Sequence, residues 1–534
     1  MSWLDALESI LVAAISAITC RYYLHMLQLE SYQLDGYNRW LGKNRDKLLG
    51  WTLNIGVIAV IVKLLLPLIL ALFMSRDAAK AVSVVLVLAG FGAAAWKLNE
   101  TQYITPPKKP LAYTPRMQRL FAATCLTALA AALLLAWIDV PPYLLFAGIP
   151  YLALAAGHLM QPIEQRVNRY FFNDAKKALE ARPDLIKIGI TGSYGKTSTK
   201  FILAAILSEK YSVLATPSSF NTPMGLTKVI RTQLEPHHQV FIAEMGARHQ
   251  GDIKELCELV GPAYGILTSV GEQHLETMLN IETIADTKFE LVEGLPSGGA
   301  AFFGADNGGW CDRLFARAKC EKYRAGLGSG YLSMYAEDIT AGPGGSRFTL
   351  SDGEGSRVAC ETKLLGRHNI QNIVLSCAVA KRMGMTMEEI ARGVSRAQPV
   401  EHRLQLIEGA NGMTVIDDAF NANPSGAAAA FEVLSSFTGR HLVVTPGLVE
   451  QGEREEELNF KFGQQMGAVT DIAILVGPKR TRPIAKGLLS VGFDVNRLHT
   501  VASLEEAKTV IAAHARQGDV ILFENDLPDN YSEG

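Results

Sequence analysis

The sequence lacks the cysteine patterns of a disulfide scaffold or a zinc site. Its 534 residues include seven cysteines, and none of these forms a C-x-x-C pair or another spacing typical of metal ligands. Such cysteine usage is typical of reduced, mostly buried thiols. We therefore predict that the soluble part of the chain lies in the cytosol.

Charged residues are also scarce, at 19%, and the formal net charge is −2. Nothing in this composition resembles a nucleic-acid footprint, so we expect no nucleic-acid partner. Hydrophobic residues make up 49% of the chain, which excludes a disordered or fibrous protein and raises the possibility of membrane segments. A chain of this length corresponds to roughly two to four domains.

Long apolar runs are present in the first 160 residues. A helix needs about 20 mostly apolar residues to cross the hydrocarbon of a bilayer. Clear candidates lie at 51–73, 81–98, 120–138 and 141–160, and a weaker one lies at about 3–20. We predict an α-helical transmembrane domain over residues 1–160, with four or five spans surrounded by membrane lipid, and a linker over 161–182.

The positions of lysine and arginine set the expected orientation, because basic connections between spans stay on the cytoplasmic side. The connections 21–50 and 97–119 carry five basic residues each, whereas the turns at 74–80 and 139–141 carry two and none. With either number of spans, the chain after residue 160 is predicted to be cytoplasmic. Lys63, inside a predicted span, is either a functional charge or a side chain that snorkels or pairs within the bundle.

After about residue 183, short β-branched strands alternate with helical stretches, which favours parallel sheets built from βαβ units. The first set of elements is strands at 185–191, 239–244 and 264–270 with a helix at 195–209. The second is strands at 413–418, 441–445, 471–476 and 519–523 with helices at 425–436, 454–467, 482–490 and 503–515. We predict a central α/β domain over 183–399 and a Rossmann-like domain over 400–534. The latter has no G-x-G-x-x-G after its first strand, so a dinucleotide is not indicated.

The strongest chemical signal lies between the strand at 185–191 and the helix that follows it. The segment is Gly192-Ser193-Tyr194-Gly195-Lys196-Thr197-Ser198. In a P-loop-type turn, backbone N–H groups and a helix N-terminus face phosphate, the lysine reaches the β- and γ-phosphates, and the threonine hydroxyl can bind Mg²⁺. The standard Walker spacing requires a glycine where Ile190 stands. The simpler alternative is a glycine-rich turn that closes an ordinary βα unit.

The shorter form, T-G-x-x-G-K-[ST], resembles the phosphate loop of the Mur ligase superfamily, and further resemblances follow in the same order along the chain. They are 219–225 (S-F-N-T-P-M-G), 243–253 (A-E-M-G-A-R-H-Q-G-D-I), 271–276 (G-E-Q-H-L-E), 285–290 (A-D-T-K-F-E), 366–372 (G-R-H-N-I-Q-N), 401–404 (E-H-R-L) and 417–424 (D-D-A-F-N-A-N-P). The last closely resembles the MurF branch, which adds D-alanyl-D-alanine. The resemblance covers about 183–534 and implies ATP as the nucleotide.

Three residues match the family's metal-binding positions. Glu244 ends a strand beside the phosphate loop, where a carboxylate can hold Mg²⁺, although a strand-end glutamate is more often only solvated. His274 follows the next strand and so opens on the same sheet edge, where ligands gather; a lone histidine there would usually be structural. Lys288 by itself would be assigned to the surface. The resemblance implies a carbamate on its amine that binds a second Mg²⁺.

Other residues are assigned to the nucleotide or the substrates. Asn369 and Asn372 are spaced i, i+3 on a helix, so both amides could face the adenine, unless Asn369 only caps that helix. By resemblance, Arg403 would reach the γ-phosphate and Asp418 the ribose or its neighbours; Arg403 could equally be a linker charge. The expected substrate ligands are Asn221, Thr222, Asn421 and Asn423. The last two could instead form the turn that Pro424 completes.

The implied reaction is ATP-dependent amide formation through an acyl phosphate, in a multi-pass protein of the bacterial cytoplasmic membrane with its catalytic domains in the cytoplasm. The expected partners are a peptidoglycan-precursor or lipid-linked acceptor and a D-amino-acid dipeptide. Two departures weaken the usual nucleotide-linked acceptor: residues 1–160 replace the family's soluble N-terminal domain, and acidic 524–530 stands where the MurF branch has a basic segment. The alternatives are a ligase for another surface polymer such as polyglutamate, and a nucleotide sensor with a degenerate ligase domain.

Overall fold

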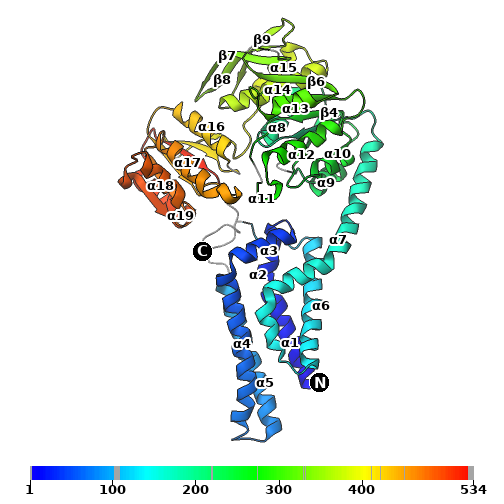
Figure 1. Cartoon of the computed structure of the whole chain (residues 1–534), viewed down its shortest axis with the longest axis vertical. Coiled ribbons are helices and arrows are strands. Elements are labelled where there is room, and N and C mark those ends of the chain that lie inside the picture. Colours follow the sequence, from blue (N-terminus) through cyan, green and yellow to red (C-terminus); the bar gives the residue numbers. More distant parts are fainter. Residues whose placement is uncertain are drawn as a thin grey trace. The chain divides into compact units, whose positions relative to one another are not determined.

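The computed structural model describes the chain except for residues 1–2, 102–108, 218–219, 273–274, 329, 331, 410–411, 421–422, 450 and 527–534, and except for the side chains of 45–49 and 275–276. The described residues form two compact units that divide between Arg169 and Tyr170 (Figure 1). We call them the helical unit and the α/β unit.

The helical unit contains α1 (Trp3–Thr19), α2 (Arg21–Leu29), α3 (Leu34–Lys43), α4 (Arg45–Leu70), α5 (Arg76–Thr101), α6 (Pro115–Trp137), the 3₁₀ helix η1 (Pro142–Gly148) and the first part of α7 (Ile149–Glu180). Five stretches are long and apolar enough to cross a membrane: Trp3–Leu29, Gly50–Leu70, Arg76–Thr101, Pro115–Trp137 and Pro142–Glu180. Each of them overlaps one of the five runs predicted from the sequence. The stretch 161–182, predicted to be a linker, is α-helical as far as Glu180.

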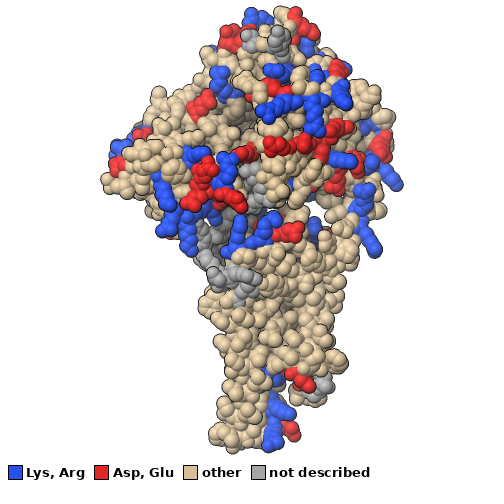
Figure 2. Space-filling model, viewed as in Figure 1, with Lys and Arg blue, Asp and Glu red and all other residues tan. Residues whose placement is uncertain are grey.

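Large apolar side chains lie on the outside of this unit as well as inside it. Leu64, Leu65 and Leu68 on α4 are all more than half exposed, and Figure 2 shows few charged side chains over these helices. In the interior, Phe91 packs edge-on against Tyr143 and Phe146, with ring centroids 5.1 and 4.9 Å apart. A helical surface that stays apolar all round is typical of a protein whose solvent is lipid.

Lys63 lies against Glu8 of α1. Its Nζ donates to Oε1 and Oε2 of Glu8 at 2.7 and 2.6 Å, and the Glu8 side chain is only 3% exposed. Of the two alternatives for Lys63, pairing within the helix bundle is therefore the one that the structure shows. Such a pair removes the cost of an isolated charge among apolar helices.

The α/β unit begins with a nine-stranded sheet. Its strands are β1 (Ile186–Thr191), β2 (Val213–Ala215), β3 (Val240–Glu244), β4 (Tyr264–Leu267), β5 (Ala300–Gly304), β6 (Glu321–Leu327), β7 (Met334–Gly342), β8 (Gly345–Ser351) and β9 (Arg357–Thr362). They lie in the order β2-β3-β1-β4-β5-β6-β7-β8-β9. Strands β2 to β7 pair in parallel around β1, and β8 and β9 are antiparallel additions.

Helices cover both faces of this sheet, so its central strands are apolar on both sides. They are α8 (Lys196–Leu207), α9 (Pro223–Gln233), α10 (Asp252–Val260), α11 (Leu275–Met278), α12 (Ile281–Glu293), α13 (Trp310–Arg317), α14 (Arg367–Arg382) and α15 (Met387–Arg396). Along β3, Val240 and Ile242 belong to the core that includes α8, α14 and α15, whereas Phe241 and Ala243 belong to the core with α9 and α10.

A six-stranded sheet follows, in the order β10-β11-β15-β12-β13-β14. Its elements are β10 (Gln405–Glu408), β11 (Thr414–Asp418), α16 (Pro424–Ser435), β12 (His441–Thr445), η3 (Gly452–Arg454), α17 (Glu455–Gly467), β13 (Ile472–Val476), α18 (Arg482–Ser490), η4 (Val495–Arg497), β14 (Leu498–Val501), α19 (Leu504–His514) and β15 (Val520–Glu524). Only the edge strand β10 is antiparallel. The predicted strands and helices of this region are all present.

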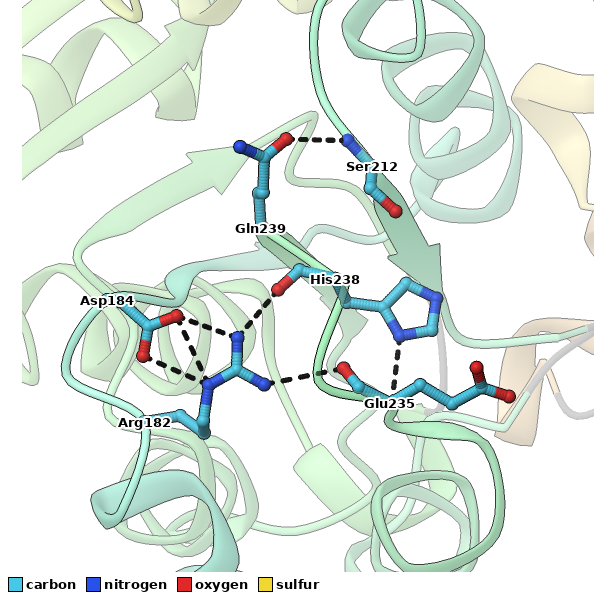
Figure 3. A network of polar contacts seen from close by, with 6 residues as sticks. All are labelled: Arg182, Asp184, Ser212, Glu235, His238 and Gln239. Carbon is cyan, nitrogen blue, oxygen red and sulfur yellow. Dashed lines mark hydrogen bonds and ion pairs between the residues drawn. The ribbon is translucent and has the colours of Figure 1, made fainter.

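A polar network ties together the segments that lead into β1, β2 and β3 (Figure 3). Arg182, just after α7, donates to the carbonyls of Glu235 and His238 at 3.3 and 2.8 Å and pairs with Asp184 at 2.7 Å. The Gln239 side chain accepts from the Ser212 backbone N–H at 3.0 Å. This network fixes the amino ends of the strands, which leaves their carboxyl ends as the edge for ligands.

Close packing of α17 on α18 provides a test of this fold. A Cβ atom at Gly463 would lie 2.2 Å from the carbonyl oxygen of Ile484, so Gly463→Ala must push the two helices apart. We expect it to destabilise the C-terminal sheet region by about 1–3 kcal/mol, measured as a lower urea midpoint for proteolysis of α17 and α18. Gly467→Ala on the same helix meets only side chains within 3.5 Å and should cost less. Equal midpoints would contradict the packing.

Candidate functional site

The phosphate-loop segment lies at the carboxyl end of β1 and leads into α8. Ser193 N–H donates to the Ser269 carbonyl at 2.8 Å, and Tyr194 N–H donates to Ser269 Oγ at 2.8 Å. Ser193 Oγ bonds the carbonyl of Gly271 at 2.9 Å and accepts from its N–H at 3.0 Å. The loop is therefore fixed to the segment that follows β4, the neighbouring strand.

Gly195 is the residue that brings Asn372 to this loop. It has φ +80 and precedes α8, and a Cβ atom there would lie 2.7 Å from Asn372 Oδ1. Asn372 is 8% exposed. A side chain at 195 would thus both strain the backbone and displace the amide. The predicted nucleotide ligand Asn372 and the predicted phosphate loop are in contact.

Lys196 folds back over its own loop. Its Nζ donates to the carbonyl oxygens of Gly192 and Ser193 at 2.6 and 3.0 Å. Burial lowers the pKa of Lys196 to about 8, and the nearby Glu244 carboxylate opposes that shift. A phosphate bound in this loop would add a negative charge beside the amine and so favour its protonated form. Thr197 and Ser198 begin α8 and are partly exposed beside it.

Glu244 is not a solvated strand-end residue, because it is 1% exposed. Its Oε2 accepts from Lys200 Nζ at 3.0 Å, and its Oε1 accepts from Asn221 Nδ2 at 3.1 Å. Asn221, assigned to the substrate from the sequence, therefore contacts the predicted metal ligand. Lys200, which is fully buried, was missed by sequence reasoning. Its position one turn after Lys196 on the same helix was the available signal.

Lys288 lies on α12 and is only 2% exposed. It is therefore no surface lysine, and burial together with the charge of Lys196 lowers its pKa to about 7. An amine with this pKa is largely neutral at slightly alkaline pH and can act as a nucleophile. The charge of Glu244 acts on Lys196, and the charge of Lys196 acts on Lys288, so the three residues lie in one region of the α/β unit.

Arg403 is held by an unusual backbone. The residues on either side, His402 and Leu404, have φ of +59 and +45, a conformation that costs non-glycine residues about 1–3 kcal/mol each. The Arg403 guanidinium carbon lies 4.6 Å from the Phe420 ring centroid. Asp418 ends β11 and accepts from the Leu404 N–H at 3.2 Å, and burial raises its pKa to about 6.

The remaining predicted residues divide into two groups. Asn369 donates its amide to the Leu365 carbonyl at 2.9 Å and does not cap α14, whose N-cap is Gly366. Thr222 caps α9 by accepting from Gly225 N–H, and Asn423 caps α16 by accepting from Gly426 N–H. Their ligand roles stay predictions. His274 and Asn421 lie outside the described residues.

The side chains around the loop suit a metal ion that is bound partly by protein and partly by phosphate. Across the residues that the structure describes, no group of three or more His, Cys, Asp or Glu side chains could hold a metal ion by itself. Glu244 and the Thr197 hydroxyl supply oxygen ligands of the type that Mg²⁺ prefers, and Mg²⁺ commonly takes one or two protein ligands with substrate phosphates and water. The residues present therefore fit Mg²⁺ that arrives with a nucleotide.

Two protein families match the chain by sequence. The Mur ligase middle domain matches residues 190–380, and the domain described as "Mur ligase, glutamate ligase domain" matches 402–524. Relatives named UDP-N-acetylmuramoyl-tripeptide–D-alanyl-D-alanine ligase include those of Bacillus subtilis strain 168 (28% identity) and Mycobacterium tuberculosis strain H37Rv (32%). The alignments cover 63% of this chain in both cases, and 72% and 69% of the relatives. For the Escherichia coli K12 ligase of that name, at 30% identity, the chain spans 66% of the relative's length.

Solved structures share the same architecture over the α/β unit. A crystal structure of MurF from Acinetobacter baumannii aligns with a TM-score of 0.61 and 26% identity, over 67% of this chain and 77% of that one. MurF from Thermotoga maritima in complex with ADP aligns with a TM-score of 0.60 and 24% identity, over 67% and 80%. The second likeness speaks for the fold alone.

The Lys200–Glu244 pair yields a stability test. Lys200→Met leaves a buried carboxylate without its cation, and breaking a buried pair in this way costs about 3–5 kcal/mol. We expect a large drop in the thermal midpoint of the variant without Mg²⁺, and a partial recovery when Mg²⁺ and nucleotide are added. The double variant Lys200→Met/Glu244→Gln should be more stable than Lys200→Met. A double variant that is less stable than either single one would contradict the pairing.

Proposed function

Because the chain belongs to the Mur ligase family, which forms C–N bonds by ATP-dependent ligation, we propose that it is a membrane-anchored ligase of cell-wall precursor synthesis. In this proposal it joins D-alanyl-D-alanine to the carboxylate of a muramoyl peptide. The observation that carries the proposal is the set Lys196, Glu244 and Lys288 beside a loop built for phosphate, in a chain whose relatives bear the MurF name.

The chemistry needs two steps, because a carboxylate is a poor electrophile. The acceptor carboxylate attacks the γ-phosphate of ATP, which gives an acyl phosphate and ADP. The amine then attacks the acyl carbon, and phosphate leaves. Lys196, whose amine already lies over the loop carbonyls at 2.6 and 3.0 Å, would turn to the β- and γ-phosphates and neutralise their charge. Thr197 and Glu244 would hold Mg²⁺, which would stabilise the negative charge on the transferring phosphoryl group.

Arg403 and the asparagines would position the nucleotide. The two left-handed residues around Arg403 hold it over the Phe420 ring, and we assign its guanidinium to the γ-phosphate. Asn372, in contact with Gly195, is assigned to the nucleotide, and Asp418 to the ribose or its neighbours. Exclusion of water from this region would protect the acyl phosphate from hydrolysis.

Lys288 is assigned a carbamate that would serve a second Mg²⁺. Carbamylation requires a neutral amine, and a pKa lowered to about 7 provides one at cytoplasmic pH. The modification also removes the cost of a buried cation close to Lys196, because it converts the positive amine into an anionic oxygen ligand. The burial of Lys288 therefore supports this assignment.

The helical unit is assigned to the cytoplasmic membrane, with the α/β unit in the cytoplasm. Its five apolar stretches and its apolar exterior support a bilayer as its surroundings. A ligase fixed there would meet lipid-linked muramoyl peptides without diffusion from the cytosol. This favours a lipid-linked acceptor, and another lipid-linked surface polymer is the second candidate.

The first test is ADP release by the full-length protein purified in detergent. UDP-muramoyl-tripeptide and a lipid-linked muramoyl tripeptide are compared as acceptors, each with and without D-alanyl-D-alanine. We expect turnover that requires the dipeptide and falls roughly 100-fold or more in Lys196→Ala, since that lysine acts on the transition state. Lys319→Ala, which alters an exposed lysine of the same unit, should leave it unchanged. Turnover without any dipeptide requirement would contradict the proposed amine.

Carbamylation has a separate test. In [¹³C]bicarbonate, the wild type should show a carbamate signal by ¹³C NMR that Lys288→Gln lacks. Because the pKa of Lys288 is about 7, lowering the pH from 8 to 6 cuts the neutral amine about tenfold, and the signal should fall accordingly. Activity lost in Lys288→Gln should recover in part with propionate, which can replace the carbamate. A signal that persists in Lys288→Gln would assign it to another lysine.

A further inference from the structure

A pair of acidic side chains ends two neighbouring strands of the C-terminal sheet. Strands β11 and β15 run parallel, and Asp418 is the register partner of Glu524 at their carboxyl ends. Glu524 is fully buried, and among the residues described no N–H or hydroxyl donor reaches its carboxylate oxygens; its one side-chain hydrogen bond is to the acid Asp418. A buried carboxylate whose only partner is a second acid is costly, because it has lost water and gained no positively charged donor in exchange.

The charges around this pair do not balance. Among the residues that the structure describes, Arg403 is the one cation that acts on Glu524, and Asp418 acts on it as a second acid. The neighbouring acid, Asp417, is already engaged with His402, whose Nδ1 lies 2.7 Å from its Oδ2. Two carboxylates against one guanidinium leave one negative charge in excess. Burial, together with the Asp418 carboxylate, raises the pKa of Glu524 well above its usual range, which favours a proton shared by the pair.

The backbone around the pair is fixed. Asn525, which follows Glu524 with φ +70, donates its backbone N–H to the Asp418 carbonyl at 3.2 Å and its side-chain amide to the Gly447 carbonyl at 2.6 Å. These bonds tie the carboxyl ends of β11 and β15 to the loop after β12. Ligands of open parallel sheets bind at such strand ends, so the buried carboxylate is already placed before a ligand arrives.

We propose that Glu524 binds the ammonium group of the amine substrate. This rests on the proposed ligase function and names the charge that its second substrate must carry. An ammonium group brings one positive charge and three N–H donors, which match one excess negative charge and the two Glu524 oxygens that no N–H or hydroxyl donor reaches among the described residues. A divalent ion would add a second charge beside Arg403, and the described residues offer no third acidic, histidine or cysteine ligand.

Recognition by Glu524 has a direct consequence for substrate choice. An amine whose nitrogen is acylated has no positive charge and would leave the Glu524 carboxylate without a counter-ion, so it should be rejected. A free ammonium replaces the shared proton, which passes to solvent. Glu524, which begins a segment that is basic in the MurF branch, is then a binding residue of this chain.

The test compares two probes on the full-length protein in detergent with ADP present. Calorimetry measures binding of D-alanyl-D-alanine and of its N-acetyl derivative, which lacks the ammonium group. We expect the wild type to favour the free dipeptide at least tenfold and Glu524→Gln to lose most of that preference. Glutamine copies the size and neutrality of the protonated acid, so the variant should fold. Glu505→Gln, an exposed change on α19, is the matched control and should behave as the wild type.

Further readouts separate this proposal from the ligase function. Binding of the free dipeptide should release close to one proton in the wild type and none in Glu524→Gln, seen by repeating the calorimetry in buffers of different ionisation enthalpy. Hydroxylamine, a mostly neutral nucleophile at pH 7.5, should still trap the acyl phosphate formed from acceptor and ATP in Glu524→Gln. If the wild type forms that product but Glu524→Gln keeps the full preference, or if the wild type binds neither probe, the proposed role of Glu524 is overturned. No trapped product with any acceptor would overturn the ligase proposal instead.

Discussion

The α/β unit depends on one constraint: Lys196, Lys200 and Lys288 are taken out of water, and one buried carboxylate, Glu244, offsets the burial of the first two. Glu244 holds Lys200 directly, and it is the acid that acts on Lys196, while Lys288 has only more distant acids to offset its burial. The nearby acids therefore do not fully offset the burial of Lys196 and Lys288, whose pKa values are both lowered. In the proposed function, an anionic phosphate beside Lys196 would offset the burial of that amine, and a carbamate on Lys288 would remove the buried positive charge there.

In the C-terminal sheet, the buried charge that lacks a full counter-charge has the opposite sign. There the excess charge is negative, because Glu524 and Asp418 share one guanidinium. In the proposed reaction, one substrate set is anionic and the other is cationic, and their reacting atoms have to meet. Arg403 links the two regions, because Glu244, Asp418 and Glu524 all act on its charge.

Much of this architecture could be predicted from the sequence, and the exceptions have physical reasons. Strands such as β1, β3, β12 and β13 were found because they are buried on both faces and read as short β-branched runs. Strands β7 to β9 were missed because they alternate buried and exposed residues at the edge of the sheet, among glycines and charges. The phosphate loop carries its signature locally. Lys200 and Glu524 were not predicted, because their roles depend on burial by tertiary packing and no local sequence pattern indicates that burial.

Helix α7 has a consequence for how the enzyme is used by the cell. Its last turns contribute Phe172, Ala175 and Leu179 to the same hydrophobic core as Leu226 and Phe241 of the α/β unit, while its first part belongs to the helical unit. The boundary between the two units lies inside α7 (Ile149–Glu180), so a protease that cuts at that boundary would have to cut within a helix. In the proposed membrane location, release of the α/β unit as a soluble form would then require local unfolding of α7.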